Sequence, residues 1–109
     1  MNVSRNDAET WASWFRALGD PSRIEILNLL ATTDQAMTVG EIVDAVDIGQ
    51  STVSHHLKVL SEPGFVHVTK AGTSSLYEMN RACLEAFPTA AETVMGKASA
   101  TAPWKGETQ

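Results

Sequence analysis

The sequence has a single cysteine, few basic residues and no long apolar segment. Because Cys83 is alone among 109 residues, no intrachain disulfide can form, and we expect a reducing, cytoplasmic environment. No run of 18 apolar residues occurs, which excludes a membrane-spanning helix in this sequence. The first ten residues are polar and lack the apolar centre of a secretory signal. These absences favour a globular protein outside membranes.

Recognisable catalytic motifs are also missing. The sequence contains no Gly-rich phosphate loop, no HExxH and no GxSxG. Ser54, His55 and His56 are consecutive, but neighbours on a helix do not face each other, and no carboxylate is spaced to orient a histidine. We therefore predict that the protein is not an enzyme and has no cofactor.

Positive charge is scarce, with 8 Lys and Arg against 13 Asp and Glu, a net charge of −5. Nucleic-acid binders usually carry a basic face. The middle of the chain is less acidic than the rest: between residues 48 and 81, Lys58, Lys70 and Arg81 stand against Glu62 and Glu78. This distribution fits a weakly positive face with the acids turned away, and it equally fits an ordinary solvated surface.

The length suits one domain, which we place at residues 1–98. Residues 99–109 are polar and without periodicity, and we predict that they form a disordered tail. The domain begins with a helix over residues 7–18, whose apolar residues Trp11, Trp14, Phe15 and Leu18 share one side. That stripe is typical of a core or a dimer interface, and a ligand pocket is the alternative.

Capping residues mark the next two helices. Asp20 precedes Pro21, which is typical of an N-cap followed by the first helical residue, and this apolar helix extends to about Ala31. Thr38 and Glu41 have the spacing of a capping box before a short amphipathic helix with Val39, Ile42, Val43 and Val46 on one side. The central part of the chain therefore predicts two packed helices.

A tight connection at residues 47–50 leads into a fourth helix, which ends at Glu62 because Pro63 cannot continue it. Asp47 stands where such turns usually carry glycine, and aspartate tolerates a left-handed backbone better than most residues. Apolar side chains of the fourth helix are predicted to face inward at Val53, Leu57 and Leu60.

A β-hairpin and a last helix follow. Strands are expected at residues 64–70 and 74–79, joined by Ala71, Gly72 and Thr73. The last helix is expected to begin near Arg81, with Leu84, Phe87, Ala91, Val94 and Ala98 on one side, and to kink or restart at Pro88. The fold class is thus mainly α with a two-stranded wing: a winged helix-turn-helix of about five helices.

The fourth helix has the side chains that a DNA-reading helix needs. Such a helix lies in the major groove with its N-terminal residues against base edges. Gln50 can pair with adenine, Thr52 can contact a thymine methyl, and Lys58 lies where a cation meets phosphate. We predict DNA contacts from this helix and from the tip of the hairpin, by Gln50, Ser51, Thr52, Ser54, His55, Lys58, Lys70 and Gly72.

Three segments resemble the ArsR/SmtB family of bacterial repressors, in order and in spacing. Residues 50–60 (QSTVSHHLKVL) resemble the recognition helix of the family, residues 17–27 (ALGDPSRIEIL) its second helix, and residues 64–77 its wing. The resemblance implies a homodimer formed by the first and last helices. It also implies a repressor that binds a pseudo-palindromic operator in double-stranded DNA and releases it in response to a metal or another signal.

The metal sites of that family are not matched. Residues 37–42 (MTVGEI) lack a Cys-x-Cys pair, and residues 80–84 (NRACL) lack the Asp and His that other members carry on the last helix. Zinc and softer metals need three or four such ligands. We therefore predict no metal at either familiar site.

Several residues keep two interpretations. Cys83 is either a small buried hydrophobe or a redox switch in a DNA-binding sensor. His56 is expected to be partly packed, and Arg23 contacts either phosphate or an acid of a neighbouring helix. For the whole chain, the alternative to DNA binding is a winged-helix module that binds a protein partner, which the acidic net charge favours.

Overall fold

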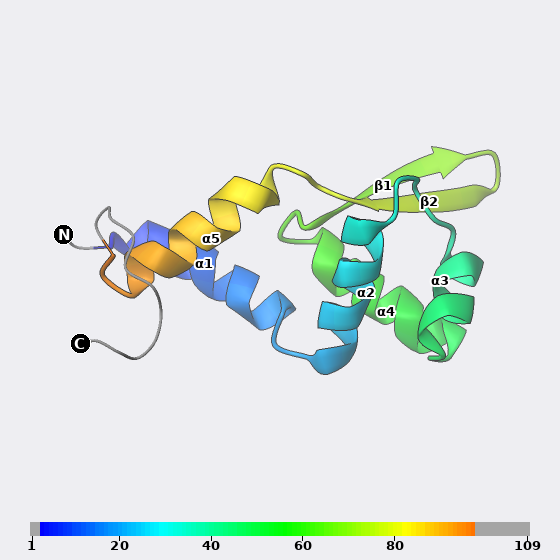
Figure 1. The fold of residues 1–109 in the computed structure, drawn as a ribbon, viewed down its shortest axis with the longest axis horizontal. Helices are drawn as coiled ribbons and strands as arrows, with labels where there is room; N and C mark the ends of the chain where they lie inside the picture. The colour runs from blue at the N-terminus through cyan, green and yellow to red at the C-terminus, as the bar shows by residue number, and fades with distance from the viewer. Residues whose placement is uncertain (1–2, 98–109) are drawn as a thin grey trace.

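The computed structural model describes residues 3–97. It has four helices, then a β-hairpin and then a last helix (Figure 1). The predicted fold class is confirmed. Ala98, the predicted tail at residues 99–109 and the domain boundary between them lie outside the described residues. The elements are α1 (Arg5–Ala17), α2 (Pro21–Thr32), α3 (Val39–Val46), α4 (Gln50–Ser61), β1 (Val66–Ala71), β2 (Ser74–Met79) and α5 (Cys83–Val94).

Side-chain caps begin the first three helices. Asp20 accepts hydrogen bonds from the backbone N–H of Ser22 at 2.8 Å and of Arg23 at 3.3 Å, with Pro21 at the first helical position. Desolvation would raise the pKa of the Asp20 carboxyl, but these backbone donors outweigh it and lower the pKa. The capping box of Thr38 and Glu41 is present as predicted.

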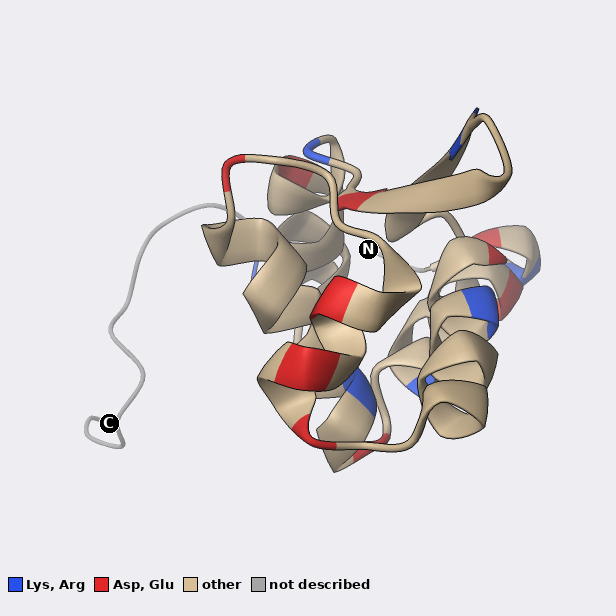
Figure 2. Ribbon diagram, turned by 90° about the vertical axis from the view of Figure 1, so that its right-hand side faces the viewer, with Lys and Arg blue, Asp and Glu red and all other residues tan. Residues whose placement is uncertain are grey.

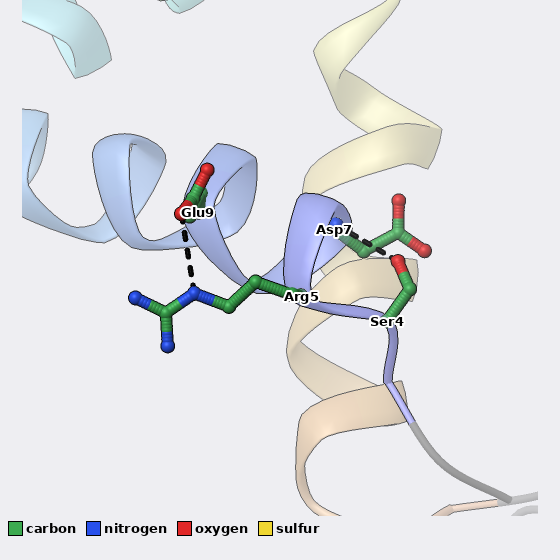
Figure 3. Close-up of polar contacts among 4 residues, drawn as sticks. All are labelled: Ser4, Arg5, Asp7 and Glu9. Carbon is green, nitrogen blue, oxygen red and sulfur yellow. Dashed lines mark hydrogen bonds and ion pairs between the residues drawn. The ribbon is translucent and has the colours of Figure 1, made fainter.

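The first helix begins earlier than expected. Ser4 accepts a hydrogen bond from the Asp7 N–H at 3.0 Å, and Arg5 pairs with Glu9 at 3.1 Å across one turn (Figure 3). These polar residues start the helix at Arg5, two positions before the predicted start at Asp7, because apolar spacing alone does not detect a polar first turn.

The core lies around α2, α3 and α4. Helix α2 occupies the middle of the molecule, between the α1 and α5 end and the α3 and hairpin end (Figure 1). The predicted inward residues of α4 are fully buried, together with residues of α2 and α3. The largest fully buried side chains are Ile26, Leu30, Ile42, Leu57, Leu60 and Val53.

The aromatic stripe of α1 divides between two roles. Trp14 packs against the core, with its ring centroid 6.5 Å from that of Phe65 and 6.4 Å from that of Phe87. Phe15 lies 5.4 Å from Phe87 and remains 41% exposed. These contacts hold α1 beside α5, and the exposed part of the stripe faces away from the core.

The hairpin differs slightly from the prediction. Ala71 belongs to β1 and pairs with Ser74, so the turn is formed by Gly72 and Thr73 alone. Gly72 has φ 66°, as the first residue of a type II′ turn requires. Tyr77 also exchanges two backbone hydrogen bonds with Met37, an unpredicted pairing that ties the hairpin to the segment before α3.

Helix α5 begins at Cys83 rather than Arg81, and it does not restart at Pro88. Proline in a helix interior removes one hydrogen bond and costs about 3 kcal/mol. Packing on both sides of Pro88 offsets this cost, because Phe87 contacts three aromatic rings and Ala90 is buried. One helix is therefore the stable arrangement.

Candidate nucleic-acid interface

Helix α4 has one apolar and one polar face. Val53, Leu57 and Leu60 are fully buried against the core. The polar side chains predicted to contact DNA on this helix are all exposed, as their positions predicted: Gln50, Ser51, Thr52, Ser54, His55 and Lys58. No acidic residue lies within α4, so the helix itself has no side chain that repels a phosphate. The orientation is confirmed, and the contacts themselves remain a prediction.

The N-terminus of α4 is open. Helices α1, α2 and α3 each begin with a side chain that bonds to the first turn, whereas Gly49 at the start of α4 has no side chain to do so. The first backbone N–H groups of a helix have no partner within the helix, and they carry partial positive charge. This end of α4 therefore presents free donors suited to a phosphate or a base edge.

The turn between α3 and α4 sets the angle of the two helices. Asp47 has φ 56° and ψ 45°, and it is the only non-glycine residue of positive φ between residues 3 and 97. Its backbone N–H donates to the Val43 carbonyl at 3.0 Å, which closes the last turn of α3. The left-handed position anticipated from the sequence is confirmed.

The hairpin tip supplies the remaining predicted residues. Lys70 and Gly72 are both exposed, and Lys70 pairs in register with Ser75 of β2. Gly72 leaves the turn without a side chain, so a nucleic-acid backbone can approach it closely. These two residues belong to the wing, so the structure brings them near each other but on a different element from the α4 residues.

Charge is not concentrated on this surface. Lys and Arg occur singly over the ribbon in Figure 2, and none of the described elements forms a basic stripe. On the candidate surface Lys58 and Lys70 are the cations. On this surface, exposed polar donors and the uncapped end of α4 are therefore more prominent than positive charge.

The two adjacent histidines do not converge on a common site. Their ring centroids are 6.0 Å apart, His55 is exposed, and His56 is 8% exposed. His56 is hydrogen-bonded through Nδ1 to Arg23 at 3.2 Å. Among residues 3–97, no three His, Cys, Asp or Glu side chains gather as metal ligands would.

Arg23 makes no ion pair with an acid of a neighbouring helix, and a contact with phosphate stays a prediction. Its Nε donates to the Ala17 carbonyl at 2.6 Å and its Nη2 to the Arg16 carbonyl at 3.3 Å, while Nη1 meets His56. All three guanidinium nitrogens are thus engaged within the chain. The partner residue lies 33 positions away, and no local spacing signals such a contact.

Cys83 is half-buried at the start of α5. Its Sγ donates to the Asn80 carbonyl at 2.8 Å. Burial raises the pKa of the thiol, although a local backbone hydrogen bond opposes the shift. A raised pKa lowers the thiolate fraction at neutral pH, which disfavours reaction with oxidants and supports the packing role over the switch.

Exposed apolar side chains mark a second surface. Val94 of α5 and residues of α1 line an open groove, which also includes Val3. Phe15, Leu84, Val94 and Met95, on or just after these helices, are 41%, 57%, 51% and 78% exposed. The sequence placed Phe15, Leu84 and Val94 on the apolar stripes of α1 and α5 but could not show that they stay uncovered, and it did not single out Met95. No helix within residues 3–97 has the length and apolarity that crossing a bilayer requires.

Comparison with known proteins agrees with this description. Residues 20–68, from the cap of α2 into β1, match the family described as bacterial regulatory protein, arsR family. The HTH-type transcriptional regulator MJ1325 of Methanocaldococcus jannaschii is 44% identical over 69 residues, 63% of this chain and 76% of the relative. Transcriptional repressor SdpR of Bacillus subtilis is 34% identical over 71 residues, 65% of this chain and 77% of the relative.

Solved structures share the fold. An ArsR-like transcriptional regulator from Rhodococcus has a TM-score of 0.71 at 24% identity, over 83% of each chain. A homodimeric winged helix-turn-helix DNA-binding domain from Mycobacterium bovis has a TM-score of 0.67 at 25% identity, over 86% of this chain and 88% of that one. With the open polar face of α4 and the wing beside it, these likenesses show that the chain belongs to the ArsR family and is a DNA-binding transcriptional regulator, not an enzyme.

Proposed function

We propose that the protein is a homodimeric repressor that binds a pseudo-palindromic operator in double-stranded DNA, with one α4 helix in each of two successive major grooves. The observation that carries this proposal is the division of α4 into a fully buried apolar face and an exposed polar face without acids. A DNA-binding regulator acts where the chromosome lies, so we assign the protein to the cytoplasm.

Roles on this surface follow from side-chain chemistry. Gln50 has a donor and an acceptor at the first position of α4, the combination that pairs with adenine. Ser51, Thr52, Ser54 and His55 can donate to base edges or to phosphates. Lys58 and Lys70 contact phosphate alone, and Gly72 lets the wing approach the backbone closely.

The dimer is assigned to α1 and α5. Their exposed apolar side chains need cover, and a second copy of the same surface supplies it in a two-fold arrangement. The Mycobacterium bovis neighbour is described as homodimeric, and SdpR as a repressor; both descriptions support the same assembly and direction of regulation here. The two α4 helices would then meet half-sites about 34 Å apart, one turn of DNA.

A titration by fluorescence anisotropy tests the proposal. An operator is first enriched with the purified protein from a pool of duplexes with a randomised centre. Labelled operator and a scrambled duplex of equal length are then titrated over a salt series. We expect a preference of about a thousandfold or more for the operator, with affinity falling as salt rises.

Equal and weak binding to both duplexes would contradict the proposal. It would favour the second candidate, a winged-helix module for a protein partner, for which the net charge of −5 is the supporting observation. Family membership favours the DNA-binding outcome.

A further inference from the structure

One guanidinium joins three helices. Arg23 belongs to α2, it donates to the Ala17 and Arg16 carbonyls at the end of α1 at 2.6 and 3.3 Å, and it meets His56 Nδ1 of α4 at 3.2 Å. Its own position is set by Asp20, which caps α2 and accepts from the Arg23 backbone N–H. The three contacts use the planar fork of arginine in three directions at once, which a lysine cannot do.

Within residues 3–97, Arg23 makes all the side-chain hydrogen bonds that join α1 to another helix or strand. Among these residues, the side chains of α4 are joined to another element by one hydrogen bond, that of His56 with Arg23. The remaining contacts of α1 with the core are apolar, through Trp14, Ala17 and Leu18. Apolar contacts permit sliding more readily than a directional hydrogen bond does.

His56 accepts in this contact. A guanidinium has donors and no acceptor, so the hydrogen bond runs from Arg23 Nη1 to His56 Nδ1. His56 is 8% exposed, and loss of its partner would leave a buried acceptor unsatisfied. The bond is therefore maintained in the folded chain.

We propose that Arg23 is a positioning residue for DNA binding: it fixes the recognition helix relative to the end of the dimerisation helix and thereby sets which spacing of operator half-sites the dimer accepts. This inference rests on the proposed function. Helix α1 is placed in the dimer interface and α4 in the groove, so the α1–α4 geometry determines the separation of the two reading helices. Adding or removing one base pair between the half-sites moves them by about 3.4 Å along the DNA axis. A small displacement of α4 therefore changes which half-site spacing the two α4 helices fit.

The test compares spacing selectivity rather than affinity alone. Wild type, Arg23→Lys and Arg81→Lys are titrated on duplexes carrying the half-site enriched by wild type, at the enriched spacing and with one base pair added or removed. Arg23→Lys keeps the charge but loses the three-way fork. Arg81→Lys is the matched control, because Arg81 Nη1 also donates to a carbonyl near a helix end, Ala31 at 2.9 Å, without reaching α4. Circular dichroism and light scattering verify fold and dimer.

We expect Arg23→Lys to reduce the ratio of affinities between the best and the neighbouring spacings by about threefold or more. Loss of one hydrogen bond from a charged group is large enough to produce this change. Arg81→Lys should keep the wild-type ratio. If Arg23→Lys weakens binding at all spacings in parallel, or leaves the ratio unchanged, the inference is overturned while the proposed function stands. If wild type has no preferred duplex, the proposed function fails, and the inference with it.

A second pair of variants decides the question if Arg23→Lys does not fold. His56→Asn places an amide oxygen close to the former Nδ1 and keeps an acceptor, whereas His56→Leu removes it. We expect His56→Asn to retain more of the spacing preference than His56→Leu. Equal preference in these two variants would overturn the role of the Arg23–His56 contact.

Discussion

We expect Gln50 and Lys70 to contribute to DNA binding in chemically different ways. Gln50 is exposed on the first turn of α4, where an amide can read a base, while Lys70 is exposed on β1, where an ammonium meets only the charge of phosphate. We expect Gln50→Ala to reduce discrimination by about 1–3 kcal/mol at one base pair of each half-site. Lys70→Ala should weaken binding to all sequences alike and reduce the salt slope by about one for each lysine lost.

Titrations of both variants against operator duplexes with single base changes measure this difference. Lys97→Ala is the matched control for charge, because Lys97 lies beyond α5 and pairs with Glu92 at 3.3 Å. The same loss of affinity on every duplex for Gln50→Ala and Lys70→Ala would refute the division of roles.

Cys83 contributes to a pH dependence of stability at the alkaline side. Burial raises the pKa of its thiol in the folded chain above that of the unfolded chain. The folded state thus favours the neutral thiol, and this contribution is present below the unfolded pKa, about 8.5 for a free cysteine, and is lost as pH rises through the folded value. We expect the free energy of unfolding to fall between about pH 8 and about pH 10.

Urea denaturation of wild type and Cys83→Ser at both pH values measures this effect. The serine hydroxyl can still donate to the Asn80 carbonyl but does not titrate in this range. A smaller alkaline loss in Cys83→Ser supports the assignment, and identical losses would contradict it. Unchanged operator affinity of wild type after mild oxidation would dismiss the redox-sensor alternative.

Among the elements, α3 and α4 depend on the turn at Asp47. A residue with a Cβ at φ 56° is strained, and a carboxylate at the end of α3 also faces the negative end of that helix. We expect Asp47→Gly to raise the free energy of unfolding by about 0.5 kcal/mol and Asp47→Val to lower it by about 1–2 kcal/mol. Thermal or urea unfolding of the two variants measures the difference, and equal stability would show that the turn tolerates any residue.

Local signals allowed most elements to be predicted. The caps of α2 and α3 and the proline after α4 are contained in a few neighbouring residues, so Asp20, Thr38 and Pro63 placed three boundaries within a residue or so. Ser4 starts α1 within a polar stretch that has no apolar period, and the sequence interpretation missed it. These errors arise where polar contacts, not apolar spacing, determine the boundary.

Long-range contacts could not be predicted in the same way. The exposed face of α4 follows from helical periodicity, so the candidate site residues on it were identifiable. The contact of Arg23 with His56 joins two helices through tertiary packing, and the bond of Met37 to Tyr77 joins a loop to a strand. Pro88 likewise stays within one helix because of aromatic packing that neighbouring residues do not reveal.

For the molecule as a whole, the exposed apolar surface of α1 and α5 is the proposed dimer interface. Val94 is 51% exposed and lines the apolar groove beside α1. We expect Val94→Glu to leave the folded protomer intact but to weaken the dimer at least about tenfold, because each copy would bury an unpaired charge in the interface. Sedimentation or light scattering over a dilution series measures the change.

Val68→Glu is the control for this prediction. Val68 is 46% exposed on β1, an apolar residue of similar exposure on the wing. Val68→Glu should leave the dimer unchanged. A dimer that resists Val94→Glu, or that is weakened equally by both substitutions, would place the interface elsewhere.

A hydroxyl-radical footprint of the protein on its enriched operator shows whether a dimer reads DNA through α4. Two α4 helices in a two-fold dimer predict two protected half-sites, related by symmetry and about 10 base pairs apart from centre to centre. Gln50→Ala should require a higher protein concentration to protect the same two half-sites. Protection of a single half-site, or of all sequences without preference, would contradict the account of a dimer that reads DNA through α4.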